Sequence, residues 1–390
     1  MRLALPAALS IYNREEANSI QARPLSNVCI IGAGPAGLAA AIAVSQTGCR
    51  ATVIDRAVPP IEKACGEGLL PDGVAALASL GVSVPFDLGF RFRGIRLSDA
   101  HSSVTADFPN GQGIGMRRAV LYDLLLGRAR ELGVTCLWGA KDIKLNASQV
   151  AVDGTTIEAN IIVAADGQNS LGRRVFGLDR IVRERRRYAF RRHYRIAPWS
   201  PYVELHWGPK CQLYITPVAS DEICVVSMSR NPGVRLEGAL GHFPAVRERL
   251  ARAVATSREM GALSLSRRLA RVCRDNVALT GDASGSVDAI TGEGLCLCFK
   301  QALSLAGALR SGDLSEYQSQ HRTLSRRPQR MVRLMLTLDR NVGFRRRVLA
   351  SLALHPRIFD SLLAVHVGAE SFSDLLCWEL FPFCRALLEV

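Results

Sequence analysis

The first third of the chain alternates short apolar runs with longer helical stretches. Residues 27–31 form a nearly continuous apolar run of the kind found in buried parallel strands, and an alanine-rich stretch follows to about residue 47. Gly48 then suits the C-terminal end of a helix. A second apolar run at 51–54 completes a strand–helix–strand unit, so the pattern predicts an α/β fold with a parallel sheet.

The middle of the chain changes to shorter strands. Apolar runs at 203–207, 212–215 and 222–228 follow one another at the spacing of an antiparallel sheet. Because buried-strand patterns flank this region on both sides, the antiparallel sheet is predicted to be an insertion. Before these runs, one stretch alternates as a half-buried strand does. The side expected to be buried carries Tyr188, Phe190, Tyr194 and Ile196.

From about residue 314 onward the pattern is helical, with apolar residues recurring at i, i+3, i+4 and i+7. Arginines fill the opposite face. One interpretation is a helix packed on the rest of the protein with a solvated arginine face. The other is a basic amphipathic helix that makes peripheral contact with an anionic membrane. The apolar stripe consists of Met331, Leu334, Met335, Leu338 and Val342.

Composition narrows the class of protein without identifying it. The chain has 390 residues, 48% of them hydrophobic and 22% charged, which excludes a disordered or fibrous protein. The net charge is 49 − 35 = +14, which can attract phosphates, acidic metabolites or a membrane surface. No nucleic-acid-binding module accompanies the charge, so we expect no nucleic-acid partner.

The cysteines indicate a reducing compartment. There are 11 of them, an odd number without any C-x-x-C pair, which fits neither a disulfide framework nor a zinc site. We therefore predict free thiols, no bound metal and a cytoplasmic location. Residues 1–26 make a weak signal peptide because charged residues follow their short apolar stretch, and we expect a disordered lead-in.

A glycine-rich turn connects the first strand to the first helix. It has the pattern G-x-G-x-x-G in strand–turn–helix context, and an acidic residue follows 23 positions after the first glycine. The helix N-terminus would face a diphosphate with free N–H groups and a positive dipole end. The acidic side chain would accept hydrogen bonds from ribose hydroxyls. The segment therefore predicts a dinucleotide site formed by Gly32, Gly34, Pro35, Ala36, Gly37, Asp55 and Arg56.

Two later motifs bear on whether the dinucleotide is FAD or NAD. A buried strand ends in D-G-x-x-S-x-x-R at Asp166, and a second strand runs into G-D at Gly281, followed by a glycine-containing turn and a helix from about 293 to 309. With these three motifs in order, residues 27–310 resemble the glutathione-reductase-type FAD fold. That fold is used by group A flavoprotein monooxygenases, geranylgeranyl reductases and flavin halogenases.

The resemblance implies roles for individual residues around an FAD cofactor. Asp282 would hydrogen-bond the ribityl chain, and the helix that follows Gly292 and Gly294 would direct its positive end at the pyrimidine end of the flavin. Asp166 and Gly167 would close over the cofactor.

A further arginine contact is expected at the start of a helix. Residues 115–121 resemble the family's R-x-x-L helix start, whose arginine reaches the FAD. Arg118 and Arg117 are both candidates for that arginine.

The reaction is less well defined than the cofactor. Residues 64–71, with Cys65 at their centre, are similar to the C-G-E/G-G loop of the geranylgeranyl reductases. Cys65 would approach the flavin or would simply fill space as a small apolar residue. The inserted sheet would line the substrate cavity, so its polar and aromatic residues are pocket candidates. These are His193, His206, Trp207 and Tyr214, and Cys65, His193 and Tyr214 are the candidates for a catalytic role.

The family implies three candidate functions. The first is an NAD(P)H-driven monooxygenase, in which a flavin C4a-hydroperoxide hydroxylates an aromatic, polyketide-like or lipid-like small molecule. The second is a reductase of an isoprenoid or lipid double bond, and the third is a non-catalytic FAD-binding protein. The sequence does not distinguish NADH from NADPH as the transient electron donor.

The expected domains follow the same resemblance. They are an FAD-binding domain at 27–180 with an excursion into the substrate domain near 82–112, a substrate-binding β-sheet domain at 181–264, a second FAD segment at 265–310 and a helical region at 311–390.

Overall fold

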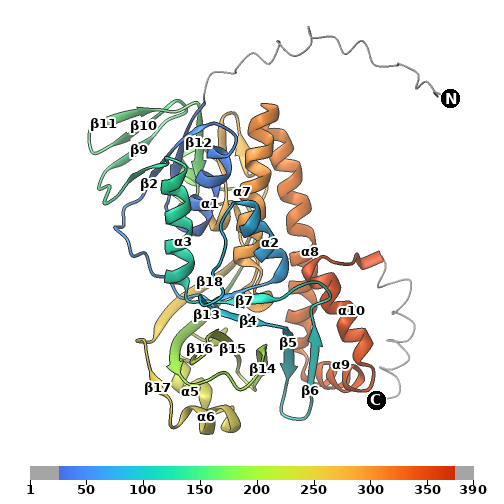
Figure 1. The fold of residues 1–390 in the computed structure, drawn as a ribbon. Helices are drawn as coiled ribbons and strands as arrows, with labels where there is room; N and C mark the ends of the chain where they lie inside the picture. The colour runs from blue at the N-terminus through green and yellow to red at the C-terminus, as the bar shows by residue number, and fades with distance from the viewer. Residues whose placement is uncertain (1–25, 374–390) are drawn as a thin grey trace, which may run out of the picture.

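The FAD-type part of the fold is a six-stranded sheet covered by helices (Figure 1). The structure is a computed structural model that describes residues 26–373, so residues 1–25 of the lead-in predicted at 1–26 and residues 374–390 of the predicted helical region lie outside the described range. The strand order is β19-β20-β12-β1-β2-β8, and all neighbours except β19 and β20 run parallel. The strands are β1 Asn27–Ile31, β2 Arg50–Ile54, β8 Thr135–Leu137, β12 Ile161–Ala164, β19 Cys273–Arg274 and β20 Val277–Leu279.

Helix α1 lies at the centre of this layer and is buried along most of its length. It begins at Pro35, whose missing N–H is tolerated in the first turn, and nearly all of its residues are small or apolar. It contacts α3 and α7 as well as β1 and β2. The helices around this core are α1 Pro35–Ser45, α2 Pro71–Ser79, α3 Arg118–Glu131, α4 Leu171–Val175 and α7 Gly294–Ser311.

The second layer is an eight-stranded sheet below the first in Figure 1. Its order is β17-β13-β16-β15-β14-β5-β6, with β18 also paired to β13. Strand β5 joins it by parallel pairing with β14, and β18 crosses the boundary expected at residue 264. The strands are β5 Gly94–Ser98, β6 Ser103–Asp107, β13 Ile181–Arg195, β14 Tyr202–Trp207, β15 Cys211–Ala219, β16 Glu222–Ser229, β17 Val254–Ala255 and β18 Met260–Leu269.

Two small sheets complete the strands. One packs beside the parallel sheet, and the other lies between the two layers, where β7 pairs with both β3 and β4. They consist of β9 Ile143–Leu145, β10 Gln149–Val152 and β11 Thr155–Glu158, and of β3 Gly68–Leu69, β4 Phe90–Phe92 and β7 Gly113–Gly115.

The burial of strand β13 departs in part from the one expected. Arg187, Ala189, Arg191 and His193 are buried and Tyr188 and Phe190 are only half-buried, whereas Tyr194 is buried as predicted. The physical reason is that both faces of the strand are covered. Helices α5 Leu236–Leu240 and α6 Pro244–Leu250 pack with the aromatic side, and the other face turns toward the FAD layer.

The C-terminal region is helical, as predicted, and covers one end of the large sheet (Figure 1). It contains α8 Leu314–Arg340, α9 Val342–Leu354 and α10 Pro356–Val367, and both α9 and α10 contact β6. Met331, Met335 and Leu338 are buried, but Val342 begins α9 and is 46% exposed. Within residues 26–373 no individual helix combines the length and apolarity that crossing a bilayer needs; the bent pair α9–α10 meets those criteria only when both helices are taken together.

Candidate functional site

A large cavity of about 1170 Å³ lies between the two layers and is lined by the FAD-type sheet, the inserted sheet and the C-terminal helices. Ligand pockets usually measure roughly 300–1,000 Å³, so this volume is large enough for a cofactor and a second molecule. One end carries the sequence motifs and polar atoms. The other end is apolar.

The glycine-rich turn is shaped by close packing on one side and left open on the other. A Cβ at Gly32, whose φ is +103°, would come within 2.5 Å of the Ala165 carbonyl oxygen, and a Cβ at Gly37 would come within 1.8 Å of the Gly32 oxygen. A Cβ at Gly34 would meet no atom within 4 Å. Gly34 also lines the cavity, so a diphosphate can approach the backbone there.

Asp55 shapes this turn from the end of β2. One of its carboxylate oxygens, Oδ2, accepts a hydrogen bond from the Ala33 N–H at 2.6 Å, and Oδ1 accepts one from the Ala57 N–H at 2.8 Å. Asp55 and its neighbour Arg56 both line the cavity. Since each carboxylate oxygen can accept more than one hydrogen bond, Asp55 retains capacity for a ribose hydroxyl.

The D-G motif forms the opposite wall of the turn. Asp166 Oδ2 accepts hydrogen bonds from the N–H groups at the start of α4, at 2.6 and 3.1 Å, while its buried Oδ1 has no hydrogen-bonding partner within the described chain. Gly167 has a φ of +78° and also lines the cavity. The buried Arg173 donates to the carbonyl oxygens of Gln168 and Ala283 at 2.8 and 3.2 Å and so connects this motif to the G-D motif.

The G-D motif lies at the end of β20 as a single 3₁₀ turn, Gly281–Ser284. Its Asp282 carboxylate lines the cavity and lies 3.0 Å from Lys63 Nζ. Gly281 has a φ of +58°, and its N–H donates to Gln301 on α7 at 2.9 Å. Gly292, in the left-handed region, then directs the chain into α7, which begins at Gly294. A helix N-terminus is thereby directed toward the cavity, as the FAD interpretation requires.

The two arginine candidates occupy different places. Arg118 is the first residue of α3 and lines the cavity. Arg117 lies beside a smaller neighbouring pocket, where its Nε donates to Glu222 Oε2 at 2.6 Å. Of the two arginines, Arg118 is therefore the one that can meet a ligand in the large cavity. Together with the open Gly34 backbone and the unpartnered Asp166 oxygen, it makes this end of the cavity fit the cofactor.

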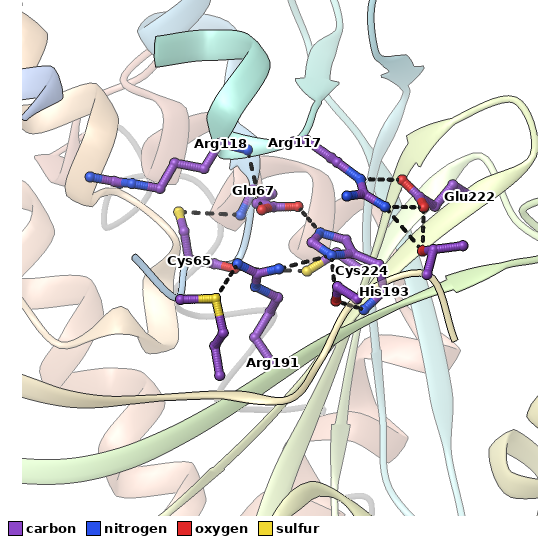
Figure 2. A network of polar contacts seen from close by, with 11 residues as sticks. Cys65, Glu67, Arg117, Arg118, Arg191, His193, Glu222 and Cys224 are labelled. Atoms are coloured by element: carbon purple, nitrogen blue, oxygen red, sulfur yellow. Dashed lines mark hydrogen bonds and ion pairs between the residues drawn. The ribbon is translucent and has the colours of Figure 1, made fainter. Parts of the chain in front are cut away.

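A buried polar network lies beside the cysteine-containing loop (Figure 2). Glu67 Oε2 and His193 Nε2 are 2.5 Å apart, and both side chains are about 1% exposed. Glu67 Oε1 accepts the Arg118 N–H at 3.2 Å, while His193 Nδ1 lies 2.8 Å from Arg191. Glu67 has a φ of +61°, a strained conformation for a residue other than glycine. The network thus holds the loop against both α3 and β13.

Cys224 completes this cluster, because its sulfur lies within 4.8 Å of the Glu67 and His193 ligand atoms. Burial raises the pKa of the Cys224 thiol well above its ordinary value, and the nearby Glu67 adds to that shift. The thiol therefore stays protonated and donates to the Cys65 carbonyl oxygen at 3.7 Å. With the Arg191 guanidinium at its edge, the cluster forms a hydrogen-bonding network between the loop and the large sheet.

The three catalytic candidates also lie in two different pockets. Cys65 and Tyr214 line the large cavity, whereas His193 faces the smaller pocket. Burial raises the pKa of Tyr214, so its phenol remains neutral and can donate; its oxygen lies 3.4 Å from the Ile290 carbonyl oxygen. His206 and Trp207 lie outside the cavity, and His206 contacts Ser98 and Glu204 at 2.6 and 3.0 Å.

The apolar end of the cavity is formed largely by α8, α9 and α10. Four of the five residues of the predicted stripe line it, namely Met331, Leu334, Met335 and Leu338. The sequence pattern identified the stripe but gave no sign that its partner is a cavity. Its lining residues include Met331, Leu334, Met335, Leu338, Phe344, Val348, Leu352, Phe359 and Leu363. The sequence pattern also gave no role to Glu67, Arg191 or His366. All three residues line the cavity, and His366 belongs to α10 at its apolar end.

Comparison with known proteins agrees with this geometry. Residues 26–87 match the family model described as "FAD binding domain". The menaquinone reductase of Mycobacterium tuberculosis is 29% identical over 323 residues, which cover 74% of this chain and 78% of that protein. The 3-amino-4-hydroxybenzoate 2-monooxygenase of Streptomyces cremeus is 26% identical over 332 residues, which cover 76% and 82% of the two chains.

A solved structure extends the agreement to the whole fold. A flavoprotein/dehydrogenase from Cytophaga hutchinsonii superposes with a TM-score of 0.75 at 19% identity, over 92% of this chain and 95% of that one. The predicted FAD fold is confirmed, and with it the FAD cofactor and an oxidoreductase activity. The chain is therefore an FAD-dependent oxidoreductase, similar over most of its length to a menaquinone reductase, an aromatic monooxygenase and a digeranylgeranylglycerophospholipid reductase.

Proposed function

We propose that this protein is an NAD(P)H-driven FAD monooxygenase that hydroxylates the ring of a large, lipid-like molecule. The observation that carries the proposal is the continuity of the cavity, which joins the flavin-type motifs at Gly34, Asp166 and Asp282 to an apolar end formed by α8–α10. A molecule with a polar ring and a long apolar chain matches both ends.

The cofactor would supply the transfer of two electrons and oxygen chemistry at the flavin C4a position. The chain's own contribution is orientation and exclusion of water. The apolar wall of α8–α10 keeps water from the substrate, and Tyr214 offers a neutral hydroxyl donor at the edge of the cavity. The positive end of α7 stabilises negative charge that develops beside it.

A second candidate is a reductase that saturates a double bond in an isoprenoid chain. The similarity to menaquinone reductases over most of the chain supports it, as does the loop around Cys65 that resembles the geranylgeranyl reductases. In that reaction the apolar end of the cavity would hold the chain that is reduced.

The two functions differ in the atoms that the product gains. The holoenzyme is reduced with NADPH, or with NADH in parallel, and mixed with ¹⁸O₂ and either 4-nonylphenol or menaquinone. Incorporation of one ¹⁸O atom into the phenol supports the monooxygenase. A gain of two hydrogen atoms by the isoprenoid, without labelled oxygen, supports the reductase. A flavin that neither nicotinamide nucleotide reduces contradicts both and favours a non-catalytic FAD-binding protein.

A further inference from the structure

A buried charged cluster lies where the apolar end of the cavity meets the start of α7. Glu293 stands between the two glycines that lead into this helix, and its Oε2 is 3.7 Å from Nδ1 of His366 on α10. Arg327 on α8 lies 3.5 Å from Glu293 Oε1 and 2.6 Å from Asp72 on α2. Lys300 on α7 completes the cluster at 2.5 Å from Asp72. The two cations thus balance the two carboxylates.

Glu293 and His366 are buried without satisfying their hydrogen-bonding groups. Glu293 is 1% exposed and His366 is 6% exposed. Among the described residues, none forms a hydrogen bond with either carboxylate oxygen of Glu293 or with Nδ1 of His366. Burial raises the pKa of Glu293, although His366 and Arg327 act in the opposite direction. Buried polar groups that lack partners are rare in folded proteins and call for a ligand or a function.

His366 also lines the cavity, which makes it the histidine of the apolar end. Its Nδ1 faces the Glu293 carboxylate, so the opposite ring nitrogen, Nε2, is the one available to a bound molecule. A carboxylate 3.7 Å from one ring nitrogen stabilises, through its negative charge, the imidazolium that forms when the other nitrogen accepts a proton.

We propose that His366, oriented by Glu293, accepts the proton of a ring hydroxyl on the substrate. In this step the substrate O–H bond breaks, the Nε2–H bond forms, and the electron pair stays on the oxygen. The resulting oxyanion makes the ring electron-rich, which favours its hydroxylation. The inference rests on the proposed function and names its substrate class, a phenol with an apolar chain.

The test follows the ionisation of a bound probe, 4-nonyl-2-nitrophenol, whose absorption distinguishes phenol from phenolate. The probe is titrated with pH in the presence of oxidised holoenzyme. We expect the bound probe to ionise at lower pH than the free probe. His366→Gln should raise that pH by about one unit or more, because one unit corresponds to a modest electrostatic interaction. Glu293→Gln should raise it by a smaller amount.

Controls separate proton exchange from structural damage. His355→Gln changes an exposed histidine at the start of the same helix and should leave the titration unchanged. FAD content is measured in each variant, and the titrations are compared only between variants that retain FAD. If His366→Gln loses FAD, His366→Asn together with Glu293→Gln provides the same comparison.

Two results would overturn the proposal. One is identical ionisation of the bound probe in the wild type and in His366→Gln; the other is failure of the wild type to bind the probe. Neither measurement requires turnover, so the outcome is independent of the ¹⁸O₂ experiment that tests the proposed function.

Discussion

Asp55 organises the glycine-rich turn through hydrogen bonds to the backbone on both sides of β2. Hydrogen bonds to a charged group contribute about 1.5–3 kcal/mol each. Asp55→Ala should therefore weaken FAD binding about tenfold or more, since the turn loses its shape and the ribose loses an acceptor. Fluorescence titration of apoprotein with FAD measures the change. Asp87→Ala, at an exposed position, is the control, and equal affinity in the two variants would contradict the assignment.

The Glu67–His193 pair couples the loop around Cys65 to the large sheet. Removing one member leaves the other buried without its partner, which costs about 3 kcal/mol or more in the free energy of unfolding. Glu67→Gln and His193→Gln should each lower stability by about that amount, and the double variant by clearly less than the sum. Urea unfolding at saturating FAD measures all three.

An exposed ion pair serves as the comparison for that cycle. Arg93 and Asp107 have side chains that are 55% and 46% exposed, and solvent screens such pairs strongly. Arg93→Gln should therefore change the unfolding free energy little. Strict additivity of the Glu67 and His193 substitutions would show that the two side chains act independently.

Residues in backbone-determined motifs could be predicted from the sequence, and residues in the polar network could not. Gly32 and Gly37 are required by close contacts that follow directly from the strand–turn–helix geometry. Glu67 and Arg191 are different, because a charged residue next to glycine or on a strand is typical of a solvated position. Only the pairing of loop, helix and sheet buries them together.

At the scale of elements, α8 supports the G-D motif through a buried histidine. His321 Nε2 lies 2.9 Å from Ser284 Oγ in the 3₁₀ turn and 3.0 Å from Gln301 Nε2 on α7. Burial lowers the pKa of His321 from its ordinary 6.5 to about 4. The unfolded chain thus takes up a proton below pH 6.5, while the folded chain does so only near pH 4.

This difference predicts a loss of stability in acid. The free energy of unfolding should fall by about 1 kcal/mol per pH unit as the pH drops from 6.5 to 4, a total of about 3 kcal/mol from this residue. His321→Gln should remove that contribution and flatten the curve in this window. Urea midpoints at several pH values measure it, with the exposed His242→Gln as the control. Parallel curves for wild type and His321→Gln would exclude the effect.

The elements themselves were largely predictable, but their faces were not. The strands and helices of the FAD-type layer follow from continuous apolar runs and glycine positions. For β13, alternation predicted a strand and the burial of Tyr194, but it also placed Tyr188 and Phe190 on the more buried face. That phase depends on which neighbour covers each side, and the neighbours α5 and α6 come from a distant part of the chain.

At the scale of the whole molecule, the apolar end of the cavity sets the size of the substrate. Met335 on α8 is buried and lines this end, so Met335→Trp should shorten it. We expect the affinity for 4-nonylphenol to fall about tenfold or more and that for phenol or 4-ethylphenol to stay within about twofold, because only the long chain meets the indole. Perturbation of the flavin spectrum measures binding.

Thr337→Trp adds the same bulk to an exposed position on the same helix and should affect neither ligand. Equal losses for short and long alkylphenols in Met335→Trp would mean that the chain does not occupy this end of the cavity.

The order of these segments in the sequence also sets the order in which the walls of the cavity are synthesised. The nucleotide motifs lie at 32–37, 166–173 and 281–294, whereas the wall formed by α8–α10 is translated after all of them. A nascent chain therefore has the groups for its cofactor before it can close the apolar end. Until α10 docks on β6, the apolar end of the cavity lacks part of its wall and stays open to solvent. Completion of the last helices thus separates a chain that merely carries a redox group from one that selects what the group acts on.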